Sequence, residues 1–198
     1  MNYISIFSTP IFVGKVGKDL SPLVSECKKQ RVMSSGRTIS NKGGWQSNDF
    51  DGKDLEFYVK NQMQEVAESW GIRGIITPSN YWYNINISQN YNLNHCHPGS
   101  ILSGVIYLKC PPNSSPIIFQ NPISALVASY IQPYVDFDFS PEISFTYSHQ
   151  PKEGDLLIFP SWLEHRVDSG DFKGERISLS FNSKVEVPST RKSYTYQQ

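Results

Sequence analysis

The sequence changes character near residue 79, and this change restricts the folds open to the chain more than any other feature. Before it, apolar residues recur with helical spacing; after it, short aromatic and β-branched segments are separated by turn signals such as Pro98-Gly99 and Gly170-Asp171. Such segments between turns are typical of short strands. Two helices followed by about eight strands predict a mainly β (α+β) fold, in which a double-sheet barrel or jelly roll is buttressed by N-terminal helices.

Two helices are predicted in the N-terminal part. The first should begin at Ser21, because Pro22 directly behind it suits the first helical turn. The second should begin near Asp51 or Asp54 and end at Gly71, since glycine commonly ends a helix in a left-handed conformation. Its apolar stripe consists of Leu55, Val59, Met63, Val66 and Trp70.

Extended segments account for most of the remaining chain. Strands are expected at residues 3–13, 80–88, 91–97, 101–109, 115–120, 142–149, 155–160, 164–169 and 175–183. Residues 41–47 are expected to form a loop, and residues 121–141 are long enough for a lid or an insertion. We therefore predict a single domain over residues 1–183, with a helical and edge-strand part at 1–78 and a jelly-roll core at 79–183. The polar residues 184–198 are predicted to be a C-terminal tail.

Composition excludes several classes of function. Eighteen Lys and Arg residues balance eighteen Asp and Glu residues, and no basic stripe stands out, so we expect no nucleic-acid partner. No segment approaches the about 20 apolar residues that a membrane helix needs, and no signal peptide is evident. The three cysteines are scattered and odd in number, which favours free thiols in a reducing compartment. We expect a soluble, cytoplasmic protein, and the sequence leaves a homodimer open.

His95 and His97 are the first candidate metal ligands. Residues two apart on a strand point to the same face, so the two imidazoles should project together while Cys96 points away. Imidazole suits iron, copper, zinc and nickel. A lone His-x-His pair is weak evidence, and two hydrogen-bonded surface histidines would give the same pattern.

His165 and Arg176 strengthen the case. Both lie near the turn signals Gly170 and Gly174, and a hairpin there would place Arg176 beside and beneath His165. An arginine inside an aromatic-rich barrel must be compensated, because an unpaired buried charge is costly. A small dicarboxylate held by the guanidinium and the Ser178 hydroxyl would do this, and an internal Arg–Asp pair is the alternative.

These motifs together resemble the 2-oxoglutarate- and Fe(II)-dependent oxygenases, in particular a subgroup from bacteria and their viruses with a His-x-His...His metal motif. The segments that carry the resemblance are 45–47 (Trp-Gln-Ser), 95–99 (His-Cys-His-Pro-Gly), 102–108, 159–165 and 176–182 (Arg-Ile-Ser-Leu-Ser-Phe-Asn). Singly these motifs are not specific; in combination they are. The resemblance implies a double-stranded β-helix, that is, a cupin-like barrel.

The resemblance also implies roles for individual residues. His95 matches the first metal histidine and His165 the distal one. His97 stands where most of the superfamily has a carboxylate; the subgroup has histidine there too, so His97 is expected to be the third ligand. A position outside the coordination sphere is the alternative for His97.

The cosubstrate residues follow from the same resemblance. Arg176 and Ser178 match the pair that binds the far carboxylate of 2-oxoglutarate. Tyr107 matches a position where related prolyl hydroxylases use a tyrosine hydroxyl on the cosubstrate, and Ser103, on the same face, is expected to assist.

The function implied is a dioxygenase that uses Fe(II), 2-oxoglutarate and O2, hydroxylates an unidentified substrate and releases succinate and CO2. By analogy, the favoured substrate is a peptidyl or amino-acid side chain. Two alternatives stay open: a cupin-like three-histidine dioxygenase that does not use 2-oxoglutarate, and a non-enzymatic jelly-roll binding or structural module. Trp162 is a candidate for the cavity entrance, Asn84, Asn86 and Asn182 are candidates for its wall, and His149 is expected to be no ligand.

Overall fold

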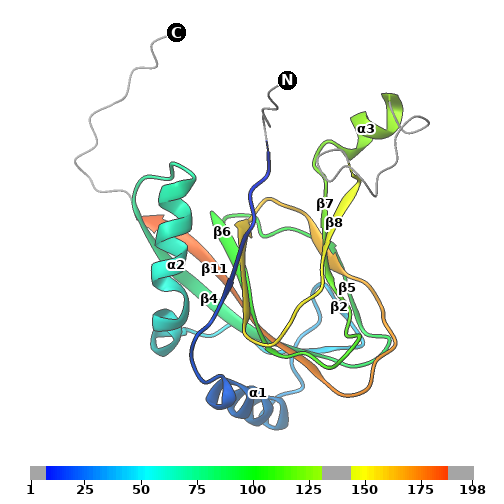
Figure 1. Cartoon of the computed structure of the whole chain (residues 1–198). Coiled ribbons are helices and arrows are strands. Elements are labelled where there is room, and N and C mark those ends of the chain that lie inside the picture. The colour runs from blue at the N-terminus through cyan, green and yellow to red at the C-terminus, as the bar shows by residue number, and fades with distance from the viewer. Residues whose placement is uncertain (1–7, 131–143, 187–198) are drawn as a thin grey trace.

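The computed structural model describes residues 8–130 and 144–186, and within them two antiparallel sheets face each other (Figure 1). The larger sheet contains, in spatial order, β1 (Phe12–Lys15), β9 (Asp155–Pro160), β6 (Leu102–Lys109), β11 (Arg176–Glu186), β4 (Ile75–Asn86) and β3 (Trp45–Gln46). The smaller sheet contains β2 (Asn41–Lys42), β5 (Tyr91–His95), β10 (His165–Val167), β7 (Ile117–Gln120) and β8 (Thr146–His149). The predicted mainly β, double-sheet architecture is confirmed.

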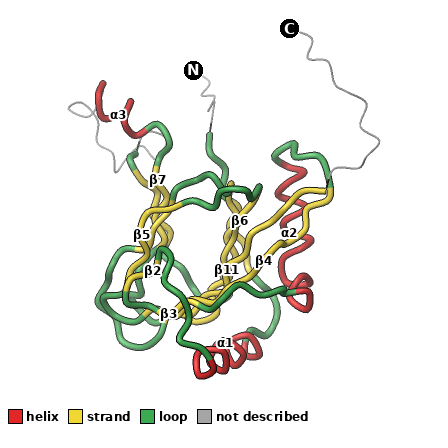
Figure 2. Tube along the Cα trace, turned by 180° about the vertical axis from the view of Figure 1, so that it is seen from behind, coloured by secondary structure: helices red, strands yellow, loops and turns green. Residues whose placement is uncertain are grey.

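Helices cover the outer face of the larger sheet (Figures 1 and 2). Helix α1 spans Ser21–Met33 and begins where the sequence predicts, with its proline in the first turn. A short 3-10 turn, η1 (Lys53–Leu55), leads into α2 (Glu56–Ser69). Gly71 follows with a φ of 71°, the left-handed conformation that glycine adopts without steric cost. Both predicted helices are therefore confirmed.

The central strands of the larger sheet, β9, β6 and the first half of β11, are buried on both faces, and alternate residues face two different interiors. On β11, Ile177, Leu179 and Phe181 pack with the helices in the main apolar cluster. The alternate residues Arg176 and Ser178 point between the two sheets and line a cavity there. This division follows from the two-residue period of a strand, and it confirms the predicted orientation of Arg176 and Ser178.

Several expected boundaries shift. Residues 41–47 are not simply a loop, because β2 and β3 form short strands at the edges of the two sheets. In the segment expected at 3–13, the strand starts at Phe12, and residues 3–7 lie outside the described part. The last strand continues to Glu186, three residues beyond its expected end.

The predicted insertion at 121–141 is described only up to residue 130. It begins with helix α3 (Ser124–Tyr130), which lies beyond the ends of β7 and β8, away from the helices α1 and α2 (Figure 1). Residues 131–141 lie outside the described residues. Within the described part, no helix is long and apolar enough to cross a membrane.

Candidate active site

Three histidines come together on the inner side of the smaller sheet. His95 is the last residue of β5, and His165, the first residue of β10, is its direct cross-strand partner. His97 lies beyond the end of β5, where its backbone N–H donates a 2.8 Å hydrogen bond to the carbonyl of Ser161. The prediction that His95 and His97 share one strand is therefore wrong: the chain leaves the sheet after His95, and a loop contact positions His97.

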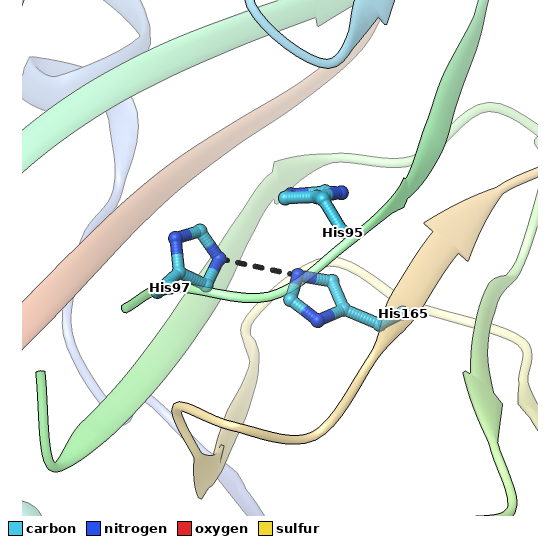
Figure 3. Close-up of side chains that lie close together, drawn as sticks. All are labelled: His95, His97 and His165. Carbon is cyan, nitrogen blue, oxygen red and sulfur yellow. Dashed lines mark hydrogen bonds between the residues drawn. The ribbon is translucent and has the colours of Figure 1, made fainter. Parts of the chain in front are cut away.

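The arrangement of the three rings fits a metal ion. One potential ligand atom from each histidine lies within 4.8 Å of the others. Nε2 of His97 and Nε2 of His165 are 3.2 Å apart and point toward one another, with the His95 ring beside them (Figure 3). Metal–imidazole bonds of about 2.1 Å at right angles place two nitrogens about 3 Å apart. The observed spacing therefore accommodates a cation without a large rearrangement.

Backbone carbonyls fix the orientation of two of these rings. Nδ1 of His95 lies 2.7 Å from the carbonyl oxygen of Leu93, and Nδ1 of His165 lies 2.9 Å from that of Leu163. A carbonyl only accepts, so Nδ1 must carry the proton in each ring. The Nε2 atoms of both rings are consequently left unprotonated, as metal ligation requires; that of His165 faces His97, and that of His95 also lies 3.5 Å from the Ser40 hydroxyl.

Burial keeps these imidazoles neutral. It lowers the pKa of His165 to about 3, with the neighbouring His95 and His97 adding to the effect. It likewise lowers the pKa of His97 to about 4, assisted by His95, and it lowers the pKa of His95. Neutral imidazole is the form that binds a metal, so the lone pairs are available at neutral pH.

Arg176, Ser178 and Tyr107 line the same cavity from the larger sheet. Ser178 and Tyr107 are direct cross-strand partners on β11 and β6, and the Arg176 guanidinium carbon lies 5.0 Å from the centre of the Tyr107 ring. Arg176 is only 3% exposed. In the described residues, its Nε and the Tyr107 hydroxyl have no hydrogen-bond partner, and no acidic side chain forms an ion pair with Arg176.

The environment of Tyr107 makes its hydroxyl a hydrogen-bond donor. Burial raises its pKa to about 12, and the nearby positive charge of Arg176 only partly opposes this shift. The phenol therefore remains protonated at neutral pH. A protonated phenol beside a guanidinium forms a donor-rich pocket that suits a carboxylate.

His165 and Arg176 come close to each other through a different strand arrangement from the predicted one. The expected hairpin is wrong, because β10 belongs to the smaller sheet and β11 to the larger one. The two residues meet across the cavity between the sheets instead. Sequence separation alone could not distinguish a hairpin from a crossing between facing sheets.

Other predicted residues lie elsewhere. The Ser103 hydroxyl is 2.7 Å from the Ser161 hydroxyl and donates to Asn182 Oδ1 at 2.8 Å, and neither Ser103 nor Asn182 is among the residues that line the cavity. His149 lies 3.2 Å from Asp155 Oδ2, outside the histidine cluster.

Sequence reasoning missed part of the cavity wall. Asn84 and Asn86 line it as expected, but so do Gln46 and Trp82, to which no role was assigned. Trp82 packs its ring 5.5 Å from that of His97. A signal for Gln46 was present, since it belongs to the 45–47 motif, but only the pairing of β3 with β4 places it at the cavity.

Comparison with known proteins agrees with this geometry. The sequence family described as "Putative 2OG-Fe(II) oxygenase" matches residues 80–182, just over half of the chain. No curated protein matches the chain.

Several solved structures share the fold. A Pseudomonas putida prolyl-4-hydroxylase has a TM-score of 0.60 at 12% identity, covering 91% of this chain and 95% of its own. The viral collagen prolyl hydroxylase of Paramecium Bursaria Chlorella virus-1, solved with 2OG, has a TM-score of 0.58 at 12% identity, covering 89% and 96%. SnoK, an alpha-ketoglutarate-dependent carbocyclase of nogalamycin biosynthesis, has a TM-score of 0.62 at 8% identity, covering 88% and 79%. These likenesses establish a double-stranded β-helix fold of the prolyl hydroxylase type.

The family match supports a 2-oxoglutarate-dependent enzyme over the two alternatives that the sequence left open. The chain belongs to the 2OG-Fe(II) oxygenase family, and is thus an enzyme that uses Fe(II), 2-oxoglutarate and O2.

Proposed function

We propose that this oxygenase hydroxylates a peptidyl or amino-acid substrate, with His95, His97 and His165 as the iron ligands and with Arg176 and Ser178 binding the far carboxylate of 2-oxoglutarate. The family membership supports the class of reaction. The likeness in fold to two prolyl hydroxylases supports the choice of substrate class.

The unpaired guanidinium of Arg176 is the observation that carries this proposal. Arg176 is almost completely buried, forms no ion pair within the described residues and lines the same cavity as the three histidines. A buried charge without a partner is strongly unfavourable, so the site is complete only when an anion is present. A carboxylate bound bidentately, with the Ser178 hydroxyl as a further donor, satisfies the guanidinium.

Tyr107 is proposed to donate its hydroxyl proton in a hydrogen bond to the same carboxylate. Iron supplies the redox chemistry when it is bound: one atom of O2 goes to the hydroxylated substrate, and the other to the succinate formed as 2-oxoglutarate loses CO2. The residues of the chain orient the cosubstrate and exclude water. Phe159, which packs 4.8 Å from His165, forms part of that dry wall.

An anaerobic spectrum tests the proposal. Fe(II) and 2-oxoglutarate added together without oxygen should give a visible charge-transfer band, and admission of air should then give succinate. The His165→Ala variant should lose both signals. His149→Ala is the matched control and should keep both, because His149 lies outside the cluster. A wild-type protein that takes up Fe(II) but shows no band with 2-oxoglutarate would contradict the proposal.

We also propose a cytoplasmic location. All three cysteines, Cys27, Cys96 and Cys110, are free thiols, which is typical of a reducing compartment. Fractionation of the native host cells tests this directly.

A further inference from the structure

A row of side chains extends the proposed cosubstrate site across the larger sheet. Tyr107 pairs with Ser178, Ser178 pairs with Asn84, and Asn84 pairs with Gln46, so these four residues lie on neighbouring strands at one level. Asn86 lies one level away, directly opposite Arg176. Strand β3 lies at the edge of the larger sheet, next to β4 (Figure 2). Neighbouring strands are about 4.8 Å apart, so Gln46 on β3 lies about 10 Å from Ser178 on β11. The row therefore leads from the cosubstrate residues toward the edge of the sheet.

The side-chain amides of Gln46, Asn84 and Asn86 have hydrogen-bonding atoms that no protein group in the described residues satisfies. Gln46 is 4% exposed and lines the cavity, yet its side chain makes no hydrogen bond within the described residues. Asn84 donates to Ser180 Oγ at 3.2 Å and Asn86 donates to Asn92 Oδ1 at 3.4 Å, which leaves their Oδ1 atoms without a protein partner there. Buried amides are almost always hydrogen-bonded, so the unpartnered Gln46 amide and the two unpartnered Oδ1 atoms that face the cavity indicate a ligand.

The charge in the cavity restricts what that ligand can be. No Asp or Glu is among the residues that line it. With the proposed loading, Fe(II) and Arg176 carry three positive charges and 2-oxoglutarate two negative ones, while the imidazoles are neutral. One positive charge therefore remains, and a cationic substrate group would be repelled.

We propose that Gln46, Asn84 and Asn86 bind an amide group of the prime substrate, either a peptide bond or a small-molecule carboxamide. A carboxamide side chain pairs with another amide through one donor and one acceptor, and the free Oδ1 atoms accept from an N–H. A carboxylate has no N–H to offer those oxygens, and an ammonium group meets the residual positive charge. This inference rests on the proposed function. The amide group bound by these three residues is a part of the substrate that is not oxidised.

Paramagnetic broadening of small probes tests the assignment without turnover. The protein is loaded anaerobically with Mn(II), which binds N and O ligand sets, and with 2-oxoglutarate. N-methylacetamide, acetate and ethylammonium are then compared by the broadening of their methyl proton resonances. N-methylacetamide should broaden most and ethylammonium least. Equal broadening of the three probes, or preference for acetate, would overturn the proposal.

Two substitutions of Gln46 make the test specific. Gln46→Met keeps the length of the side chain but removes its hydrogen bonds, and it should weaken N-methylacetamide binding about tenfold. Gln46→Glu should weaken amide binding and improve ethylammonium binding, because it neutralises the residual charge. The matched control is Gln30→Met on the distant helix α1, which should change neither. Unchanged amide binding in both Gln46 variants would contradict the proposed amide site.

A third comparison separates the two sources of an amide. A capped tetra-alanine peptide that binds at least about tenfold more tightly than N-methylacetamide assigns the group to a peptide. Equal affinity assigns it to a small carboxamide. Failure of the Fe(II)–2-oxoglutarate band in the wild-type protein refutes the proposed function and this inference with it, whereas a normal band without amide binding refutes this inference alone.

Discussion

Replacement of Arg176 by methionine should separate binding of the cosubstrate from stability of the fold. The substitution keeps much of the buried volume and removes the only cation among the residues that line the cavity. A hydrogen bond to a charged group contributes about 1.5–3 kcal/mol, and the proposed contact is bidentate. The loss of about 3–4 kcal/mol corresponds to a Kd for 2-oxoglutarate about 140- to 700-fold higher, at about 1.4 kcal/mol per decade.

In the absence of 2-oxoglutarate, Arg176→Met should be more stable than wild type, or its free energy of unfolding should be unchanged. In wild type the guanidinium is buried without an ion pair in the described part of the chain, so its removal relieves a desolvation cost. Binding of 2-oxoglutarate should distinguish the wild type from the variant. At 100 times its wild-type Kd, 2-oxoglutarate should stabilise the Fe(II)-loaded wild type by about 2.7 kcal/mol. The same concentration should leave Arg176→Met nearly unaffected.

Two measurements check these values. An anaerobic titration that follows the visible band gives the Kd, and thermal unfolding with and without 2-oxoglutarate gives the stabilisation. Arg166→Met is the matched control, since Arg166 is partly exposed on β10 and pairs with Asp168. A Kd for Arg176→Met within about threefold of wild type would refute the reasoning, and so would an unliganded Arg176→Met protein that unfolds far more easily than wild type.

Three further outcomes follow from the structure. His97→Ala should weaken iron binding by more than about 100-fold, beyond the about 10- to 100-fold typical of a residue that only supports a ligand; equilibrium competition with a chelator measures this. Gly104→Ala should destabilise the fold by about 2–3 kcal/mol in urea unfolding, because the added Cβ would lie 2.3 Å from the Phe181 ring and 2.6 Å from the Leu157 carbonyl oxygen. For Asp155, burial raises the pKa but hydrogen bonds and a neighbouring lysine outweigh it, so the folded-state pKa is lowered. Its carboxylate therefore stabilises the fold above an unfolded-state pKa of about 4, and this contribution is lost as the pH falls through the lower folded-state pKa. Asp155→Asn should lower the free energy of unfolding by about 1–2 kcal/mol at pH 7. The difference from wild type should shrink steadily below pH 4.

The sequence by itself determined the features that depend on local physics. The start of α1 follows from a proline that fits only the first turn, and the end of α2 from a glycine with a positive φ. The split of β11 into Arg176 and Ser178 on one face and Ile177 and Leu179 on the other follows from the two-residue period of a strand. The three candidate metal histidines were also recognisable, because few residue types can bind iron and their spacing was informative.

The tertiary structure alone decided which of these features meet. Strand pairing assigned β10 and β11 to facing sheets, so His165 and Arg176 approach each other across a cavity and not along a hairpin. A backbone contact with Ser161 placed His97 after its strand had ended. Edge pairing of β3 brought Gln46 to the cavity wall from a segment that reads as a loop. Such contacts join residues that are far apart in the chain. Their free energy comes from apolar surface that distant segments bury together, and the order of residues within one segment does not encode which segments will meet.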